Sequence, residues 1–243
     1  MADENGIRDV LTPEIEAALM EVATATLTHQ LQKRGIRTTF FAGLKPLNPG
    51  KRMVGRARTL RYVAVREDVQ KDYSAGMNAQ RSIVNSMTPG DVLVIEARGV
   101  PDAATIGDIY ATRAFHLGCR GIVTDGALRD TPAIQALGHP VYHLASHGAV
   151  LGRQHMPFSA DEPVSCAGVF VVPGDIVVGD GEGAVVIPAD LVEEVVRDTV
   201  EQEDRESFAA ERVAAGESFV GLFPLTDARM ADYEAWKAAR NGG

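Results

Sequence analysis

The amino-acid sequence predicts an α/β fold. Two short, nearly continuous apolar runs, residues 92–97 and 121–124, are typical of buried strands, and a helical pattern from Thr105 to Leu117 separates them. Strand, helix and strand in this order form a β-α-β unit, from which parallel sheets are built. β-branched runs between residues 164 and 188 alternate with Gly-containing turns and add antiparallel hairpins.

The N-terminal elements are helical. Thr12 followed by Pro13 is a helix N-cap with Pro at the first helical position, and residues 24–35 form a second helical segment that ends at Gly35. After several turn signals, β-rich runs around Val54 and over residues 60–65 predict a first pair of strands. Residues 72–87 have helical spacing and lead into the β-α-β unit.

The second half of the chain is richer in strands and ends in helix. Residues 139–142 predict a short strand, and residues 147–161 are expected to be loop-rich. A long helix follows Asp190; its second half carries too few apolar residues to be buried on its own subunit, so we expect it to lie against a neighbouring chain. We expect one domain over residues 1–243, with an N-terminal helix at about 12–34 and a C-terminal helical extension at about 190–243.

Composition excludes several classes of function. The formal net charge of −9 argues against a general nucleic-acid binder, because such proteins cluster Lys and Arg against phosphates. No apolar run reaches the roughly 18 residues that cross a bilayer, and the first ten residues do not resemble a signal peptide. We therefore expect no membrane partner and a cytoplasmic location. Cys119 and Cys166 are too few for a disulfide framework and predict buried thiols.

Three candidate motifs favour structural interpretations. The Gly179–Gly183 segment leads into a strand rather than a helix, so it predicts a hairpin turn and not a phosphate-binding loop. His143 and His147 are four residues apart, but their surroundings indicate strand and loop, which does not favour a zinc site. The chain has no GxSxG sequence for a nucleophilic serine.

The most informative residues border the β-α-β unit. Asp108 follows Gly107 at the expected start of the helix, and Arg129 and Asp130 follow the Asp125-Gly126 turn after the strand. The unit is expected to bring both ends to one edge of the sheet. Two interpretations stay open at this point. In the first, Asp108 simply caps the helix while Arg129 forms a surface ion pair. In the second, the three residues form a site for an anion and a hard cation, since such cations need only one or two carboxylates plus other oxygens.

The spacing of these residues resembles a known family. Asp108, 20 intervening residues and then Arg129-Asp130 reproduce the D-x20-R-D signature of the RraA-like family, and segments over about residues 20–215 are similar to that family in the same order. The resemblance implies an α/β fold with a swivelling β/β/α sandwich. It also implies a homotrimer or a dimer of trimers with active sites between subunits.

The family includes class II, metal-dependent 4-hydroxy-4-methyl-2-oxoglutarate / 4-carboxy-4-hydroxy-2-oxoadipate aldolases. The resemblance therefore implies cleavage of a 4-hydroxy-2-oxo acid to pyruvate and a second carbonyl product, with oxaloacetate decarboxylation as a side activity. A small 2-oxo acid would be the substrate and Mg²⁺ or Mn²⁺ the cofactor.

The resemblance also implies roles for individual residues. Asp130 would hold the metal ion directly, and Asp108 would hold it through water. Arg129 would bind the keto oxygen of the substrate. The pyruvyl carboxylate would lie on backbone N–H groups of residues 107–110, which are Gly107, Asp108, Ile109 and Tyr110.

A carboxylate from the neighbouring subunit's late helix completes the metal shell in these aldolases. Glu206 is our candidate for it, with Glu201, Glu203 and Asp204 as alternatives.

Two other functions are compatible with this resemblance. The family contains protein inhibitors of ribonuclease E, some of which lack the Asp of the RD pair, so the presence of Asp130 favours an enzyme. A lyase or decarboxylase for another 2-oxo acid, such as a sugar-acid derivative, is the second alternative. The His-rich region 139–155 and the extended C-terminal tail depart from the family pattern and could alter the substrate preference.

Overall fold

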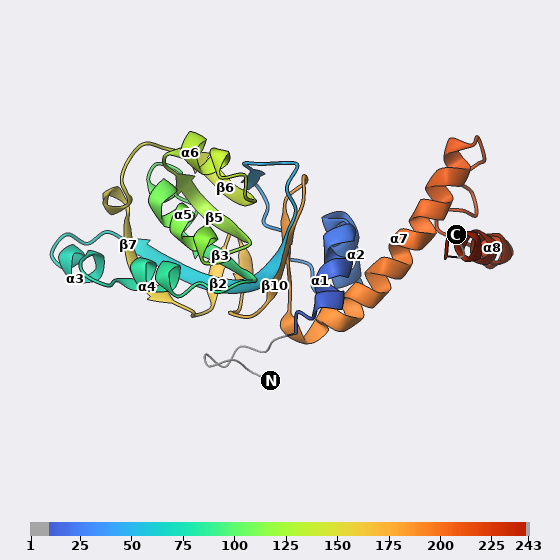
Figure 1. Cartoon of the computed structure of the whole chain (residues 1–243), viewed down its shortest axis with the longest axis horizontal. Coiled ribbons are helices and arrows are strands. Elements are labelled where there is room, and N and C mark those ends of the chain that lie inside the picture. The colour runs from blue at the N-terminus through green and yellow to red at the C-terminus, as the bar shows by residue number, and fades with distance from the viewer. Residues whose placement is uncertain (1–9, 242–243) are drawn as a thin grey trace.

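The computed structural model describes residues 10–241, and its centre is a curled mixed β-sheet flanked by helices (Figure 1). The predicted α/β class is therefore confirmed. The strands are β1 (Lys45–Pro46), β2 (Met53–Ala64), β3 (Asp91–Glu96), β4 (Ala104–Ile106), β5 (Gly121–Leu128), β6 (Val141–Ser146), β7 (His155–Ala160), β8 (Val164–Cys166), β9 (Val169–Val171), β10 (Ile176–Gly179) and β11 (Ala184–Ile187). The α-helices are α1 (Pro13–Glu21), α2 (Thr24–Lys33), α3 (Gln70–Ser74), α4 (Ala79–Asn85), α5 (Asp108–His116), α6 (Thr131–Ala136), α7 (Val192–Ala214) and α8 (Met230–Asn241).

The sheet combines a parallel centre with antiparallel edges. Its main path runs β1-β6-β5-β3-β2-β10-β11, with β4 beside β5 and β7 beside β2. The pairs β2–β3, β3–β5, β5–β6 and β4–β5 are parallel. The expected β-α-β unit is β3-α5-β5, and β8–β9 and β10–β11 are the expected antiparallel hairpins. The Gly179–Gly183 segment is indeed the β10–β11 turn.

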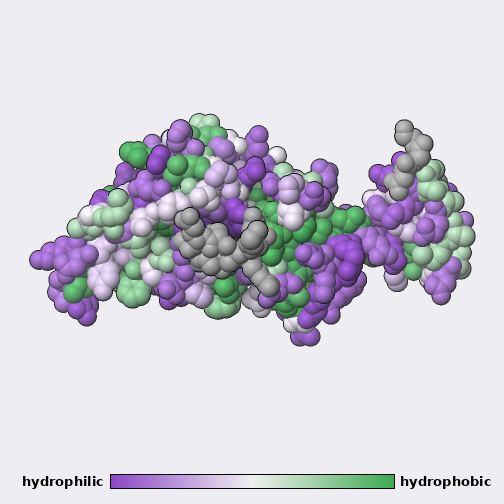
Figure 2. Space-filling model, turned by 60° about the horizontal axis from the view of Figure 1, so that its bottom comes forward, coloured by the Kyte–Doolittle hydropathy of each residue, from purple (hydrophilic) through white to green (hydrophobic). Residues whose placement is uncertain are grey.

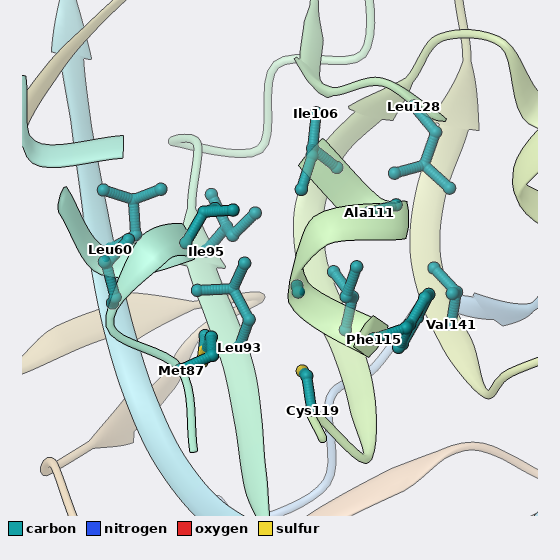
Figure 3. Packing of buried hydrophobic residues seen from close by; sticks show 14 of the residues in the cluster. Leu60, Met87, Leu93, Ile95, Ile106, Ala111, Phe115, Cys119, Leu128 and Val141 are labelled. Atoms are coloured by element: carbon teal, nitrogen blue, oxygen red, sulfur yellow. The ribbon is translucent and has the colours of Figure 1, made fainter. Parts of the chain in front are cut away.

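Alternation along β3 explains why its sequence is almost entirely apolar. Leu93 and Ile95 pack beneath α4 and α5, whereas Val92 and Val94 face the opposite side, where β8 and β9 cover the sheet. Successive strand residues point to opposite faces, so a strand covered on both sides needs apolar residues at every position. Figure 3 shows the α5 side of this core, with Phe115 and Ala111 of the helix packed over the strands.

The N-terminal helices α1 and α2 pack on the end of the sheet formed by β10, β11 and the start of β2. The Thr12 hydroxyl accepts from the Ile15 N–H at 3.3 Å, which confirms the predicted N-cap of α1. The N-terminus of α2 is held by Asp180, which accepts from the backbone N–H and the hydroxyl of Thr24, each at 2.9 Å. These bonds connect α2 to the β10–β11 turn, and both helices lie between the sheet and α7 (Figure 1).

Several boundaries differ from the sequence expectation. The expected pair of strands before residue 65 is one 12-residue strand, β2, which is long enough to pair with β10 at one end and β7 at the other. The expected helix over 72–87 is two short helices, α3 and α4, separated around Gly76, which has a positive φ of 54°. The expected loop over 147–161 contains β7.

Two corrections concern the central unit itself. The helix begins at Asp108, not Thr105, because Thr105 and Ile106 belong to β4 and pair with β5. The expected turn at Asp125-Gly126 lies inside β5, which continues to Leu128. A Cβ on Gly126 would come within 2.7 Å of Ala97 Cβ, so glycine serves close packing at this position rather than a turn.

The C-terminal helices form an arm that stands away from the sheet (Figures 1 and 2). The first half of α7 packs on α1 and α2 through Val192, Val195 and Val196. Phe208 in its second half is fully buried against α8 of the same chain, in a small cluster with Tyr233 and Trp236. Part of the apolar surface of the second half of α7 is thus buried by α8 of the same chain. The sequence analysis expected it to be buried by a neighbouring chain.

Candidate functional site

Parallel pairing of β4 and β5 brings the two halves of the site together. Ile106 and Leu128 are register partners, and the Arg129 N–H donates to the Ile106 carbonyl at 3.2 Å. Figure 3 shows Ile106 and Leu128 at the same end of the core. Because both strands end at this level, Gly107 and Arg129 leave the sheet side by side. The unexpected strand β4, rather than a turn at Asp125-Gly126, produces this juxtaposition.

A cavity of about 390 Å³ opens beside these strand ends. Asp108 and Tyr110 line it from the start of α5, and Arg129 and Asp130 line it from the end of β5. Its remaining wall comes from β4, α3, α4, β7 and residues 150–152, which include the start of a short 3-10 helix, Leu151–Arg153. Further lining residues are Ser74, Asn78, Gln80, Arg81, Ala104, Thr105, Ile106, Gly107, Ile109, Val150, Leu151, Gly152 and Pro157.

Arg129 and Asp130 form an ion pair at the mouth of this cavity. Arg129 Nε lies 3.1 Å from Asp130 Oδ2, and both side chains are 41% exposed. Asp130 has φ 55° and ψ 33°, a left-handed conformation that is uncommon outside glycine. Such conformations gather at functional sites, where the surrounding structure holds them in place. Its carbonyl begins α6 by accepting from the N–H groups of Ala133 and Ile134.

Gly107 supplies the close approach between the two segments. A Cβ at this position would lie 3.0 Å from Asp130 Oδ2 and 3.1 Å from Arg129 Cγ. The backbone of Gly107 is extended, with φ −118°, so the glycine serves close packing at this position and not a special conformation.

The N-terminus of α5 lines this cavity with residues 107–110. The first N–H groups of a helix have no partner within the helix and carry a partial positive charge. Asp108 Oδ1 accepts from the Ile109 N–H at 2.8 Å, and the Ile109 side chain is 78% exposed. The charge at this helix start favours a carboxylate next to Arg129, which would compete with Asp108 for the Ile109 N–H.

A buried polar network fixes β4 behind the cavity. The Thr105 carbonyl accepts from the Tyr62 hydroxyl and from Gln80 Nε2, each at 2.8 Å, and the Thr105 hydroxyl donates to the Ala127 carbonyl at 2.9 Å. Burial raises the pKa of Tyr62 well above its usual value, so its hydroxyl stays protonated and keeps donating. This network connects β2, α4 and β5 to β4, the strand that ends directly before Gly107.

The sequence analysis missed the α3–α4 wall. Asn78 caps α4 by accepting from the Arg81 N–H at 3.1 Å, and its amide donates to the Ser74 carbonyl at 3.0 Å. Arg81 and Gln80 reach the cavity from the first turn of this helix. An Asn three residues before Arg81 is a helix-start signal that could have located the boundary, but no local pattern shows that this turn faces Asp108.

The donors near Asp130 suit a hard cation. Across residues 10–241, no group of three or more His, Cys, Asp or Glu side chains is arranged to hold a metal ion. The cavity instead offers the carboxylates of Asp130 and Asp108. Mg²⁺ is commonly held by one or two carboxylates together with water and substrate oxygens, so these residues fit such an ion, whereas zinc sites need more protein ligands.

Glu206 is not near this cavity in its own chain. It lies on the second half of α7, where its carboxylate accepts from Gln202 Nε2 at 2.7 Å, and the lining of the cavity includes no residue of α7. A role of Glu206 in the site therefore requires a second subunit. The same holds for Glu201, Glu203 and Asp204, which belong to the same helix.

Comparison with known proteins identifies the family. The family model described as RraA-like, Aldolase/RraA, matches residues 24–186. The chain belongs to the RraA-like family. The matched range contains the whole sheet except the last residue of β11, together with Asp108, Arg129 and Asp130. The C-terminal arm lies outside it.

Relatives of this RraA-like chain carry different names. A protein of Halalkalibacterium halodurans named "Putative 4-hydroxy-4-methyl-2-oxoglutarate aldolase" is 35% identical over 160 residues, which are 66% of this chain and 71% of that protein. Protein DlpA of Legionella pneumophila is 29% identical over 199 residues, which are 81% of this chain. The aligned segment is only 31% of DlpA's length.

Solved structures confirm the RraA-like fold. RraAS2 of Streptomyces coelicolor, titled an unusual member of the RNase ES inhibitor RraA protein family, superposes with a TM-score of 0.77 at 33% identity and covers 83% of this chain and 98% of its own. An uncharacterized protein of Pseudomonas syringae has a TM-score of 0.76 at 25% identity, and the match covers 87% of this chain and 98% of that protein.

No helix among residues 10–241 is long and apolar enough to span a membrane.

Proposed function

We propose that this RraA-like protein is a divalent-metal-dependent lyase that cleaves a 4-hydroxy-2-oxo acid to pyruvate and a second carbonyl compound. The observation that carries the proposal is the grouping of Asp108, Arg129 and Asp130 around one cavity at the ends of β4 and β5. The name of the Halalkalibacterium halodurans relative supports the same reaction class.

The chemistry follows from where charge develops. In retro-aldol cleavage the C4 hydroxyl loses its proton to water and becomes the second carbonyl as the C3–C4 bond breaks. The electron pair of that bond leaves a pyruvate enolate with negative charge on the C2 oxygen, and protonation of C3 then gives pyruvate. Arg129 donates to this oxygen, and the N–H groups at the start of α5 hold the adjacent carboxylate. Fixed donors aimed at a developing charge favour the transition state over the substrate, and therefore accelerate the reaction.

Asp130 and Asp108 would hold the cation, Asp130 directly and Asp108 through water. A bound Mg²⁺ or Mn²⁺ ion would supply Lewis-acid stabilisation of the same enolate charge. Decarboxylation of oxaloacetate leaves the same enolate after loss of CO₂, so we expect it as a side activity.

A coupled assay for pyruvate tests the proposal. Pyruvate release from 4-hydroxy-4-methyl-2-oxoglutarate and from oxaloacetate is measured with Mg²⁺, with EDTA, and after Mg²⁺ is restored to the EDTA-treated protein. We expect release from both compounds with Mg²⁺, its loss with EDTA, and its recovery. Release from oxaloacetate alone would point to another 2-oxo acid as substrate.

Inhibition of a ribonuclease E-type enzyme is the second candidate function, favoured by the likeness to Streptomyces coelicolor RraAS2. Lack of pyruvate release from both compounds, together with inhibition of RNA cleavage by such an enzyme, would replace the lyase with this function.

A further inference from the structure

A second cation, Arg81, faces the same cavity from a different wall. It lies in the first turn of α4 and is half-buried, whereas Arg129 follows β5. Its Nε donates to the Tyr110 hydroxyl at 3.2 Å, and its Nη1 donates to the Gly76 carbonyl at 2.5 Å. These two bonds hold the guanidinium between the α3–α4 turn and the first turn of α5.

The guanidinium has unused binding capacity. Within residues 10–241, Arg81 has no carboxylate partner, and its Nη2 has no hydrogen-bond acceptor. By contrast, the buried Arg58 is paired with both Asp161 and Asp91, and Arg129 is paired with Asp130. An arginine is always charged and presents five donors, so a half-buried one without an anion is suited to bind one.

We propose that Arg81 binds a second carboxylate of the substrate, at the end away from the pyruvyl group. This inference rests on the proposed function, because it assumes that Arg129 and the start of α5 hold the 2-oxo acid end. The acid would then extend across the cavity to α4. Tyr110 is a positioning residue, since its hydroxyl fixes Nε and leaves the Nη2 side free.

The cavity wall supports an acid with a short carbon chain between two anionic ends. Apolar side chains, Ile106, Leu151 and Pro157, line the cavity together with the two arginines. The planar guanidinium matches the two oxygens of a carboxylate, and such charge-assisted bonds are about twice as strong as neutral ones. A neutral chain of sugar-type hydroxyls would gain less from Arg81, because its hydrogen bonds to the guanidinium lack the second charge.

A purely structural role for Arg81 makes a different prediction. Its bond to the Gly76 carbonyl closes the α3–α4 turn, so its loss could loosen this turn and weaken every ligand equally. A carboxylate-binding role weakens only ligands that carry the second carboxylate. Two five-carbon acids separate these cases, because 2-oxoglutarate and 2-oxopentanoate differ only in a carboxylate or a methyl group at the far end.

The test is calorimetric binding of both acids to the full chain in Mg²⁺. Neither acid has a 4-hydroxyl group, so neither undergoes retro-aldol cleavage during the measurement. We expect the wild type to bind 2-oxoglutarate roughly 10-fold or more tightly than 2-oxopentanoate. Arg81→Gln should bring the two affinities within about 3-fold of each other, mainly by weakening 2-oxoglutarate, and Arg81→Lys should keep part of the preference because it keeps the charge.

Arg113→Gln is the matched control. Arg113 also joins α4 and α5, donating from Nε to Asn85 Oδ1 at 3.1 Å, but it does not line the cavity, so the preference should remain. Equal affinities in the wild type, an unchanged preference in Arg81→Gln, or binding of neither acid would overturn the inference. If the wild type prefers 2-oxoglutarate through Arg81 but releases no pyruvate from 4-hydroxy-4-methyl-2-oxoglutarate, the lyase proposal fails and the carboxylate site stands.

Discussion

The Cα atom of Gly107 lies so close to Asp130 that a Cβ there would be 3.0 Å from Asp130 Oδ2. The same Cβ would be 3.1 Å from Cγ of Arg129. The backbone that follows β4 and the ion pair that follows β5 therefore lie so close together that only a residue without a side chain fits between them comfortably. A side chain at this position would push against the two groups on which the proposed chemistry depends, by a few tenths of an ångström.

Gly107→Ala should lower pyruvate release by roughly 10-fold or more, because a shift of the ion pair away from the substrate oxygen removes transition-state stabilisation. The backbone conformation suits alanine, and the displaced side chains are half-exposed, so the free energy of unfolding should change by less than about 1 kcal/mol. Gly50→Ala is the control, since a Cβ on Gly50 meets nothing within 4 Å. Wild-type activity in Gly107→Ala would show that the close approach is irrelevant to the reaction.

Arg129→Ala and Asp130→Asn should each reduce pyruvate formation by at least about 100-fold, as expected when a donor at a developing oxyanion or a metal ligand is lost. Stability should change little, because an exposed ion pair contributes about 0–1 kcal/mol. Chemical denaturation measures the second effect. Asp68→Asn, which breaks the exposed Arg66–Asp68 pair, is the matched control. Near-normal turnover in either variant would refute the assignment of the site.

His155 should make stability depend on pH. It is fully buried, and its Nε2 has no hydrogen-bond partner among residues 10–241. Burial, with the nearby Arg98, lowers the pKa of His155 to about 4. Between about pH 6.5 and 4 the unfolded chain then binds a proton that the folded chain does not, so stability falls as the pH falls, by about 3 kcal/mol in all.

Denaturant unfolding at pH 7 and pH 4.5 measures this effect. His155→Gln should lose less stability over this range than the wild type, because its position no longer titrates. His116→Gln, at an exposed position of α5, should behave like the wild type. Equal losses in all three proteins would mean that His155 takes up its proton without cost in the folded state.

Phe208→Ala should loosen the arm and leave the sheet intact. The Phe208 ring packs against Tyr233 and Trp236, with ring centroids 5.8 Å and 5.7 Å apart, in a cluster separate from the sheet's cores. Loss of a buried Phe side chain costs about 3–5 kcal/mol, which here falls on the α7–α8 contact. Trp236 is the only tryptophan, so its fluorescence should shift to longer wavelength well below the main unfolding transition.

Phe170→Ala is the control for this variant, because Phe170 is 65% exposed. A single transition with unchanged fluorescence in Phe208→Ala would show that the arm and the sheet unfold together.

The buried strands were the most predictable part of this fold. Val92 to Ile95 and the β10–β11 hairpin carry their signal locally, in runs of β-branched and apolar residues with turn residues between them. β4 was missed because three residues give no periodic pattern, and Thr105 and Ile106 fit the helix that follows equally well. Its pairing with β5 is a tertiary contact, which overrides local propensity.

The site was predictable to a similar, limited extent. The β-α-β geometry correctly placed Asp108 at the same edge of the sheet as Arg129 and Asp130. The expected turn at Asp125-Gly126 was wrong, and β4 was not foreseen. Arg81 was missed because it lies 27 residues before Asp108, in a segment expected to be one long helix. Only the break at Gly76 turns the first residues of α4 toward the cavity, and a sequence pattern does not show the direction of such a turn.

The two walls of the cavity have separate origins in the chain, and this separation affects how the protein could evolve. The groups that would carry out bond cleavage follow β4 and β5, whose positions are fixed by a buried network. The residues facing the far end of a substrate come from the short α3–α4 turn. Mutation of that turn can change which acids are accepted while the bond-breaking groups stay in place. Related proteins could therefore differ in substrate specificity and still catalyse the same reaction.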